Sequence, residues 1–167
     1  MNEQLTTDDL VRLIRRVFEP TPADEGLAII VDVPDARCPD NADWRHRRAM
    51  AADWYGRLSG SLDALGLRRV TLAWFRNSGG NNADLPDRWF SGDGRTIPDH
   101  ADELTDGGRP FAELYAAHSL LLAPTQMSAT APLKVAARGG AFRAATMPGF
   151  SPAMIPALRL DYGEVNR

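Results

Sequence analysis

An apolar run near the start of the chain sets the strongest limit on its fold. Residues 27–33 read Leu-Ala-Ile-Ile-Val-Asp-Val. A run of this length fits a strand, and because apolar residues occupy neighbouring rather than alternating positions, both faces of that strand are expected to be buried. Strands covered on both faces are typical of parallel sheets flanked by helices. We therefore expect residues 27–33 to form the first central strand of such a sheet.

Helix and strand patterns alternate along the rest of the chain. A first helix is predicted to begin at Thr7, and its apolar stripe consists of Leu10, Leu13, Ile14 and Val17. A long helix is predicted over residues 44–65, ended by Gly66. Further strands are predicted at 68–75, 119–123 and 142–146, and further helices at 110–118, 128–138 and from Ser151. This alternation predicts one α/β domain over residues 1–167, with a Rossmann-like, mostly parallel sheet flanked by helices.

Residues 76–109 interrupt the alternation as a polar insertion after the second strand. Gly, Asn, Asp and Pro dominate the segment, which is longer than a plain loop usually is. The stretches 88–91 and 95–97 flank Gly92-Asp93-Gly94, whose glycines permit the positive φ angles of tight turns. We expect these two stretches to pair as a small hairpin.

Charge and composition exclude several classes of partner. The net charge of −3, from 19 basic and 22 acidic residues, offers no positive field for a polyanion, so nucleic acid is not an expected partner. No apolar run approaches the about 20 residues that cross a bilayer, so a membrane is not expected either. The N-terminus lacks the pattern of a secretory signal and Cys38 is the only cysteine, which predicts a cytoplasmic location.

The sequence patterns of common catalytic sites are absent. The histidines His46, His100 and His118 form no metal-binding spacing, and neither a phosphate loop nor a dinucleotide-binding glycine pattern is present. Residues 149–153 approach a nucleophile elbow, but Ala153 replaces its last glycine, and helix capping explains Ser151 better. We therefore predict no catalytic residue, no metal site and no cofactor, and hence a protein that is not an enzyme.

Four carboxylates lie at and after the end of the first strand, where open α/β sheets place their ligands. They are Asp32, Asp35, Asp40 and Asp43. The interpretation we favour is structural: Asp40 or Asp43 caps the long helix, and the others pair with Arg45, Arg47 and Arg48. A magnesium or phosphoryl-transfer site is the alternative. Cys38 lies among them in a polar loop, and we interpret it as a solvated thiol, with a catalytic thiol as the alternative.

Peptide binding is the function that the polar residues favour. Residues 77–84 hold the densest cluster of amide side chains, and asparagine both donates and accepts, as recognition of a peptide backbone requires. An ordinary turn is the alternative for this cluster, and a packing role is the alternative for Trp89. We predict that arginines bind peptide carboxylates, asparagines the backbone and Trp89 an apolar side chain. The predicted peptide-binding residues are Arg76, Asn81, Asn82, Trp89, Arg109 and Arg143.

The chain resembles a known family, most clearly over residues 124–162. The matching features are the strand 27–32 with the long helix after it, Lys-Val-Ala-Ala-Arg at 134–138, residues 143–150, Met154 and Asp161-Tyr162. They resemble the amino-terminal domain of thermophilic-type metalloaminopeptidases, the M29 family, and of the related dihydroxypyridine dioxygenases. The resemblance implies a fold and an association with peptide substrates. The family's metal ligands belong to a carboxyl-terminal domain, so none corresponds to a residue matched here.

Two interpretations follow from the resemblance. We expect a stand-alone, non-catalytic peptide-binding accessory or regulatory protein, of the kind that serves ribosomal peptide natural-product (RiPP) biosynthesis. Its partners would be a peptide or precursor peptide, with a modifying enzyme or a second copy of the chain, and binding would use a sheet edge or the carboxyl-end cleft. The alternative is a truncated peptidase: a fragment or subunit of a metal-dependent aminopeptidase whose catalytic domain lies elsewhere.

Overall fold

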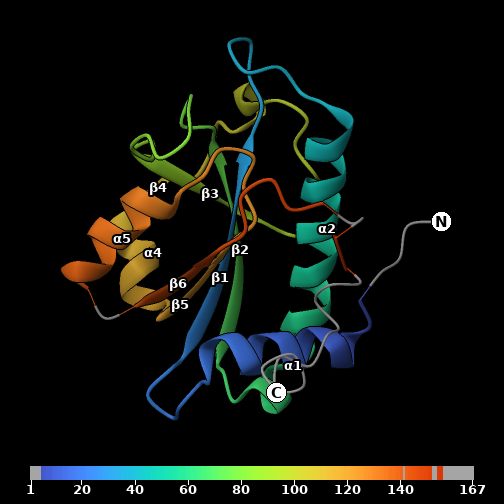
Figure 1. Ribbon diagram of the computed structural model, residues 1–167, viewed down its shortest axis with the longest axis vertical. Coiled ribbons are helices and arrows are strands. Elements are labelled where there is room, and N and C mark those ends of the chain that lie inside the picture. Colours follow the sequence, from blue (N-terminus) through green and yellow to red (C-terminus); the bar gives the residue numbers. More distant parts are fainter. Residues whose placement is uncertain (1–4, 141, 152–153, 156–167) are drawn as a thin grey trace, which may run out of the picture.

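The protein is built on one six-stranded sheet. The computed structural model describes residues 5–140, 142–151 and 154–155. The strands follow the order β4-β3-β2-β1-β5-β6 (Figure 1). Their bounds are β1 Gly26–Val33, β2 Arg69–Arg76, β3 Arg88–Gly92, β4 Arg109–Pro110, β5 Leu120–Ala123 and β6 Arg143–Thr146. β1 pairs in parallel with β2 and β5, and β5 with β6, whereas β3 and β4 pair in antiparallel. The predicted α/β fold with a mostly parallel, Rossmann-like sheet is confirmed.

Helices cover both faces of the sheet. In Figure 1, α1 (Thr7–Phe18) and α2 (Ala42–Ser59) lie on one side, and α4 (Phe111–Ala117) and α5 (Thr130–Arg138) lie on the other. Two shorter elements are α3 (Leu62–Leu65) and the 3-10 turn η1 (Ala101–Glu103). None of the helices within the described ranges is long and apolar enough to cross a membrane.

These layers explain the apolar run in β1, whose residues are all buried. The side chains of the odd-numbered residues from Leu27 to Val33 point into the core shared with α1 and α2, and all of them are apolar. Ala28 and Ile30 point the other way, into the core shared with α4 and α5. Because successive side chains of a strand point to opposite faces, a strand between two helix layers needs apolar residues at nearly every position.

The first helices differ from the prediction in detail. Val17 is 46% exposed, and Phe18 is buried in its place. Phe18 follows Ile14 by four residues and so continues its face of α1 with a larger apolar side chain. The long helix predicted over residues 44–65 is broken into α2 and α3, because Gly60 ends α2 and Ser61 begins a new turn.

The hairpin predicted within residues 88–97 is wrong. β3 pairs with β2 and β4, and residues 95–97 form no strand. The cause lies at Asp93, whose Oδ1 accepts the backbone N–H groups of Arg95 (2.8 Å) and Thr96 (2.9 Å). Its side chain therefore takes the donors that a returning strand would need for its ladder. The polar segment instead extends the sheet beyond β2 with two antiparallel strands.

The second half of the fold follows the prediction closely. Helices α4 and α5 and strands β5 and β6 begin and end within two residues of the predicted bounds. The helix predicted from Ser151 lies largely outside the described residues.

Candidate functional site

The strand order creates a topological switch point beside β1. The chain passes from β1 to β2 on one side, and later to β5 on the other side. Open α/β sheets bind ligands outside the carboxyl ends of their strands at such a point, because the loops there diverge. The loops that follow Val33 in β1 and Ala123 in β5 therefore form the candidate site.

Asp32, the penultimate residue of β1, ties these two loops together. Its side chain is buried, and its two oxygens accept the N–H groups of Gln126 (2.8 Å) and Met127 (2.9 Å). Burial raises the pKa of Asp32, although these hydrogen bonds and the charge of Arg47 act in the opposite direction. Both carboxylate oxygens are thus engaged by the backbone of the β5–α5 loop.

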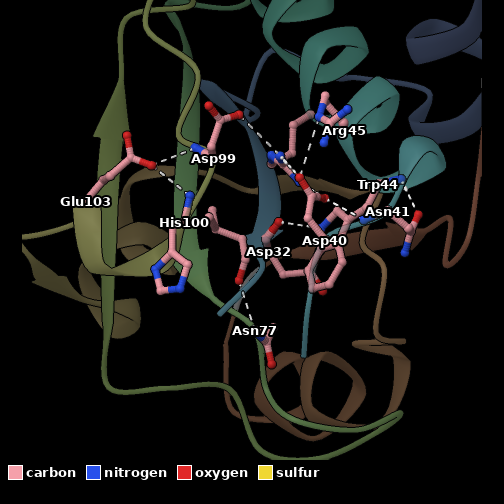
Figure 2. Close-up of polar contacts among 11 residues, drawn as sticks. Asp32, Asp40, Asn41, Trp44, Arg45, Asn77, Asp99, His100 and Glu103 are labelled. Atoms are coloured by element: carbon pink, nitrogen blue, oxygen red, sulfur yellow. Dashed lines mark hydrogen bonds and ion pairs between the residues drawn. The ribbon is translucent and has the colours of Figure 1, made fainter. Parts of the chain in front are cut away.

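Helix α2 begins at this end of the sheet. Asn41 caps it by accepting the N–H of Trp44 at 2.8 Å, so the prediction that Asp40 or Asp43 is the cap is wrong. Asp40 is not free for this role because its carboxylate pairs with arginines of α2. The Trp44 indole N–H donates to the Asp32 carbonyl at 2.9 Å, which fixes the first turn of α2 against β1; both residues are labelled in Figure 2.

Arg47 follows on the same helix and is only 2% exposed. Its Nε donates to the Phe150 carbonyl, and its Nη1 donates to Gln126 Oε1 at 2.6 Å. Among the described residues, its guanidinium forms no ion pair and its Nη2 has no hydrogen-bond partner. Burial lowers the pKa of Arg47, while the charges of Asp32 and Asp43 raise it. The prediction that Arg47 pairs with one of the loop carboxylates is therefore wrong.

A cavity of about 520 Å³ opens beside Arg47. Its lining residues come from the start of α2 and from the loops after β5 and β6: Asn41, Ala42, Asp43, Arg47, Gln126 and Gly149. Asn41 and Asp43 are exposed, so solvent reaches the cavity. The amide nitrogens of Asn41 and Gln126 have no hydrogen-bond partner within the part of the chain that the structure describes. The cavity thus combines one buried cation, one exposed carboxylate and two amide donors.

Arg48, the next residue of α2, belongs to a second polar cluster. Its side chain is fully buried and donates to Asp40 Oδ1 (2.9 Å) and Oδ2 (2.8 Å), with Asp99 at 3.6 Å. Arg45 lies 3.7 Å from Asp40 and is visible beside it in Figure 2. The hydrogen bonds from Arg48 hold the pKa of Asp40 below its usual range. The predicted pairing of Arg45 and Arg48 with a loop carboxylate is confirmed. Arg48 also attaches the polar insertion to α2, through its contact with Asp99.

Arg76, the first predicted peptide-binding residue, ends β2 and binds two carboxylates. Its Nη1 donates to Asp35 Oδ2 at 3.1 Å, and its Nη2 donates to Asp102 Oδ1 at 2.7 Å. The hydrogen bond to Asp102 is the main cause that raises the pKa of Arg76. A peptide carboxylate would have to compete with both partners for this guanidinium.

Asn81 and Asn82 bind the beginning of α5. Asn81 Oδ1 accepts the N–H of Ser128 at 2.9 Å, and Asn82 Oδ1 accepts the N–H of Ala131 at 3.0 Å. The N-cap position of α5 is Ala129, which has no side-chain acceptor of its own. Asn82 also adopts a φ of 62°, in the left-handed region that asparagine tolerates better than most residues. The oxygens of both asparagines are therefore used within the protein.

The other three predicted residues lie elsewhere. Trp89 is buried and its indole N–H donates to a carbonyl of β4, which fits the alternative packing role. Arg109 lies 5.5 Å over the Trp89 ring and pairs with Glu113 at 3.0 Å. Arg143 begins β6, at the amino end of the sheet, where it binds Asp24 at 3.1 Å. The structure does not bring the six predicted residues together in one site.

Arg47 and Gln126 are the cavity residues that sequence reasoning missed. A signal for Arg47 was present, because Trp44, Arg47, Ala51 and Trp54 recur at three- and four-residue steps and so share one face of a helix. A cation on an apolar stripe is a candidate for burial and thus for a specific role. Gln126 carries no comparable signal, since only the sheet topology brings its loop next to α2.

Within the described ranges, no group of three or more His, Cys, Asp or Glu residues could hold a metal ion.

Cys38 is partly buried in the loop after β1, and its backbone N–H donates to Asp35 Oδ1 at 2.9 Å.

Comparisons with known proteins assign no family to the chain. No protein-family model, no curated protein and no solved structure matches it. The resemblance to the M29 family and the peptide function that it implies therefore stay predictions.

Proposed function

We propose that this protein is a non-catalytic accessory or regulatory protein that binds a peptide in the cavity beside Arg47. The observation that carries the proposal is the position of this cavity, at the carboxyl ends of β1 and β5, where α/β sheets of this kind bind ligands. In the setting that the family resemblance suggests, the ligand is a precursor peptide and the partner is an enzyme that modifies it.

The size and chemistry of the cavity support a peptide segment. Its volume of about 520 Å³ lies within the range typical of small-molecule sites. The amide nitrogens of Asn41 and Gln126 are donors, which suit the carbonyl groups of a peptide backbone. One cation and one carboxylate, Arg47 and Asp43, match a ligand with few charges better than a polyphosphate.

Calorimetric titration of the whole chain with a panel of short peptides tests the proposal, with metal analysis and an aminopeptidase assay on the same preparation. We expect saturable binding of at least some peptides without their cleavage. Gln126→Leu, which removes a cavity donor, should weaken binding about tenfold. Arg109→Gln is the matched control, because Arg109 lies on β4 and does not line the cavity.

The alternative function makes the opposite prediction. If the chain is a subunit or fragment of a metal-dependent aminopeptidase, stoichiometric zinc and peptide cleavage would accompany binding, alone or after addition of a partner that supplies the catalytic domain. Cleavage by this chain would contradict the proposal. If Gln126→Leu and the wild type bind peptide with equal affinity, the cavity is not the binding site.

A further inference from the structure

We propose that the cavity at the start of α2 binds one carboxylate group of its ligand, held by Arg47 and by the free backbone N–H groups of the first turn of α2. This inference rests on the proposed function and specifies which part of a peptide is recognised. The carboxylate can be that of a peptide C-terminus or of an Asp or Glu side chain, and the experiment below separates these sources.

Arg47 carries a positive charge in a buried position. A guanidinium remains protonated in proteins, and a buried charge is costly unless it is paired. The Arg47 side chain has two hydrogen bonds to neutral oxygens, from Phe150 and Gln126, but within the described ranges it has no ion-pair partner. Its neighbour Arg48, equally buried, has a bidentate carboxylate partner in Asp40. Asp32 and Asp43 are near enough to act on the charge of Arg47, but within the described residues neither carboxylate forms an ion pair or a hydrogen bond with its guanidinium.

The cavity gives an anion a direction from which to approach Arg47. Arg47 lines the cavity together with the first residues of α2, an 18-residue helix. The N–H groups of Ala42 and Asp43 have no partner among the described residues, since Asn41 caps only that of Trp44. Free N–H groups and the positive end of the helix dipole favour an anion at this place. Arg47 and the helix start thus face the same space.

The chemistry of the cavity suits a carboxylate better than a phosphate. An arginine presents a planar fork that matches a carboxylate in two parallel hydrogen bonds, and the free Nη2 of Arg47 can supply one of them. Asp43 also lines the cavity and adds a negative charge at its exposed side. A doubly charged phosphate would be repelled more strongly by Asp43 than a singly charged carboxylate would be.

Three peptides probe the inference directly. They are N-acetyl-trialanine with a free carboxyl terminus, the same peptide as its C-terminal amide, and N-acetyl-Ala-Glu-Ala amide. We expect the wild-type chain to bind the first peptide about tenfold or more tightly than the amide, because a charge-assisted hydrogen bond is lost in the amide. If the glutamate peptide recovers the affinity, the source is a side chain; if only the free acid binds, the source is the C-terminus.

Variants connect this preference to Arg47. In Arg47→Gln the preference for the free acid over the amide should disappear, and Arg47→Lys, which keeps the charge and loses the fork, should retain part of it. Arg45→Gln is the matched control, because it removes an exposed arginine of the same helix that does not line the cavity. Since a change at buried Arg47 can impair folding, Ala42→Leu provides a second route: Ala42 is exposed and lines the cavity, so a leucine there should block the ligand and leave the fold intact.

The outcomes separate the inference from the proposed function. Equal affinity of the wild type for acid and amide overturns the carboxylate site and leaves peptide binding in place. Protection against thermal unfolding by sodium acetate, dependent on Arg47, without binding of any peptide supports the carboxylate site and overturns the peptide function. Tighter binding of inorganic phosphate than of the free-acid peptide overturns the choice of a carboxylate. Unchanged binding to Ala42→Leu places the ligand outside the cavity and overturns the site.

Discussion

Two consecutive arginines of α2 show how much a side chain's surroundings determine its role. Arg47 and Arg48 are both buried at the start of the same helix. Arg48 is neutralised by Asp40 and holds the loop after β1 in place, whereas Arg47, within the part of the chain that the structure describes, donates its hydrogen bonds to neutral oxygens and lines the cavity. The first has a structural role, and the second is the residue to which we assign ligand binding.

The Arg48–Asp40 pair leads to a prediction on stability. Asp40→Asn leaves the buried Arg48 without a full counter-charge, and we expect the free energy of unfolding to fall by about 3 kcal/mol. Arg45→Gln removes the exposed partner of the same carboxylate and should cost less than about 1 kcal/mol. Urea unfolding followed by tryptophan fluorescence measures both. A loss at Asp40→Asn no larger than at Arg45→Gln would contradict this account.

Two glycines should respond in opposite ways to the same change. A Cβ at Gly92 would clash with Trp74 Nε1, so Gly92→Ala should destabilise the fold by about 1–3 kcal/mol through overpacking. Gly56 lies within α2 and a Cβ there would meet nothing within 4 Å, so Gly56→Ala should stabilise it by about 0.5–1 kcal/mol. Thermal unfolding of the two variants tests the pair, and a stable Gly92→Ala protein would show that the β2–β3 packing is looser than described.

At the scale of secondary-structure elements, the polar insertion is integrated into the fold at several points. It supplies β3 and β4 to the sheet, and Asp99 and Asp102 from its later part pair with Arg48 and Arg76. Its first residues reach across to α5, where Asn82 provides the cap that Ala129 lacks. The segment thus links both helix layers to the sheet.

The cap at α5 gives a prediction that contrasts with a ligand-binding role. Asn82→Ala removes the acceptor for the Ala131 N–H and also places alanine at a positive φ, so we expect a loss of about 1–2 kcal/mol. Asn82→Gly relieves the backbone and loses only the acceptor, so its loss should be smaller. Chemical unfolding measures both, and peptide titration is the control: affinity should stay near the wild-type value, since Asn82 does not line the cavity.

Elements with a strong local signal could be predicted from the sequence, and contacts between distant elements could not. The apolar run that begins at Leu27 predicts β1 because a strand buried on both faces needs apolar residues at nearly every position. The glycines at 92 and 94 predict a hairpin, but that prediction takes no account of the Asp93 side chain, which binds the backbone N–H groups that the second strand would need. Residue type and local clustering are the only signals behind the six predicted site residues, and these signals do not reveal that the side chains of Trp89 and Asn82 serve packing and capping. Gln126 meets Arg47 only through the strand order, which no local pattern contains.

Across the molecule as a whole, Asp24 connects three segments at the amino ends of the parallel strands, opposite the cavity. It accepts hydrogen bonds from Ser119 Oγ at 2.6 Å, from Thr21 N at 2.9 Å and from Arg143 Nη2 at 3.1 Å. The segment before β1 is thereby joined to the starts of β5 and β6. Burial by itself raises the pKa of Asp24, but the hydrogen bonds from Arg143, Ser119 and Thr21 outweigh it and lower the pKa to about 2.

This carboxylate should make the stability of the protein sensitive to acid. Because the pKa of Asp24 is lower in the folded than in the unfolded chain, its contribution is present above about pH 4 and is lost as the pH falls towards 2. We expect a loss of about 1 kcal/mol from this group, allowing for the screening of half-exposed Arg143. Asp24→Asn should flatten that part of the curve of unfolding free energy against pH. Identical curves for Asp24→Asn and the wild type would contradict the assignment.

The central place of β1 also has a consequence during translation. β1 leaves the ribosome early and finds β2 soon afterwards, but its other edge is completed only by β5, which begins at Leu120. Until that segment is synthesised, the nascent polypeptide carries an unpaired edge on a strand made almost wholly of apolar residues. Such edges invite aggregation, so rapid overproduction of this chain calls for low temperature or abundant chaperones.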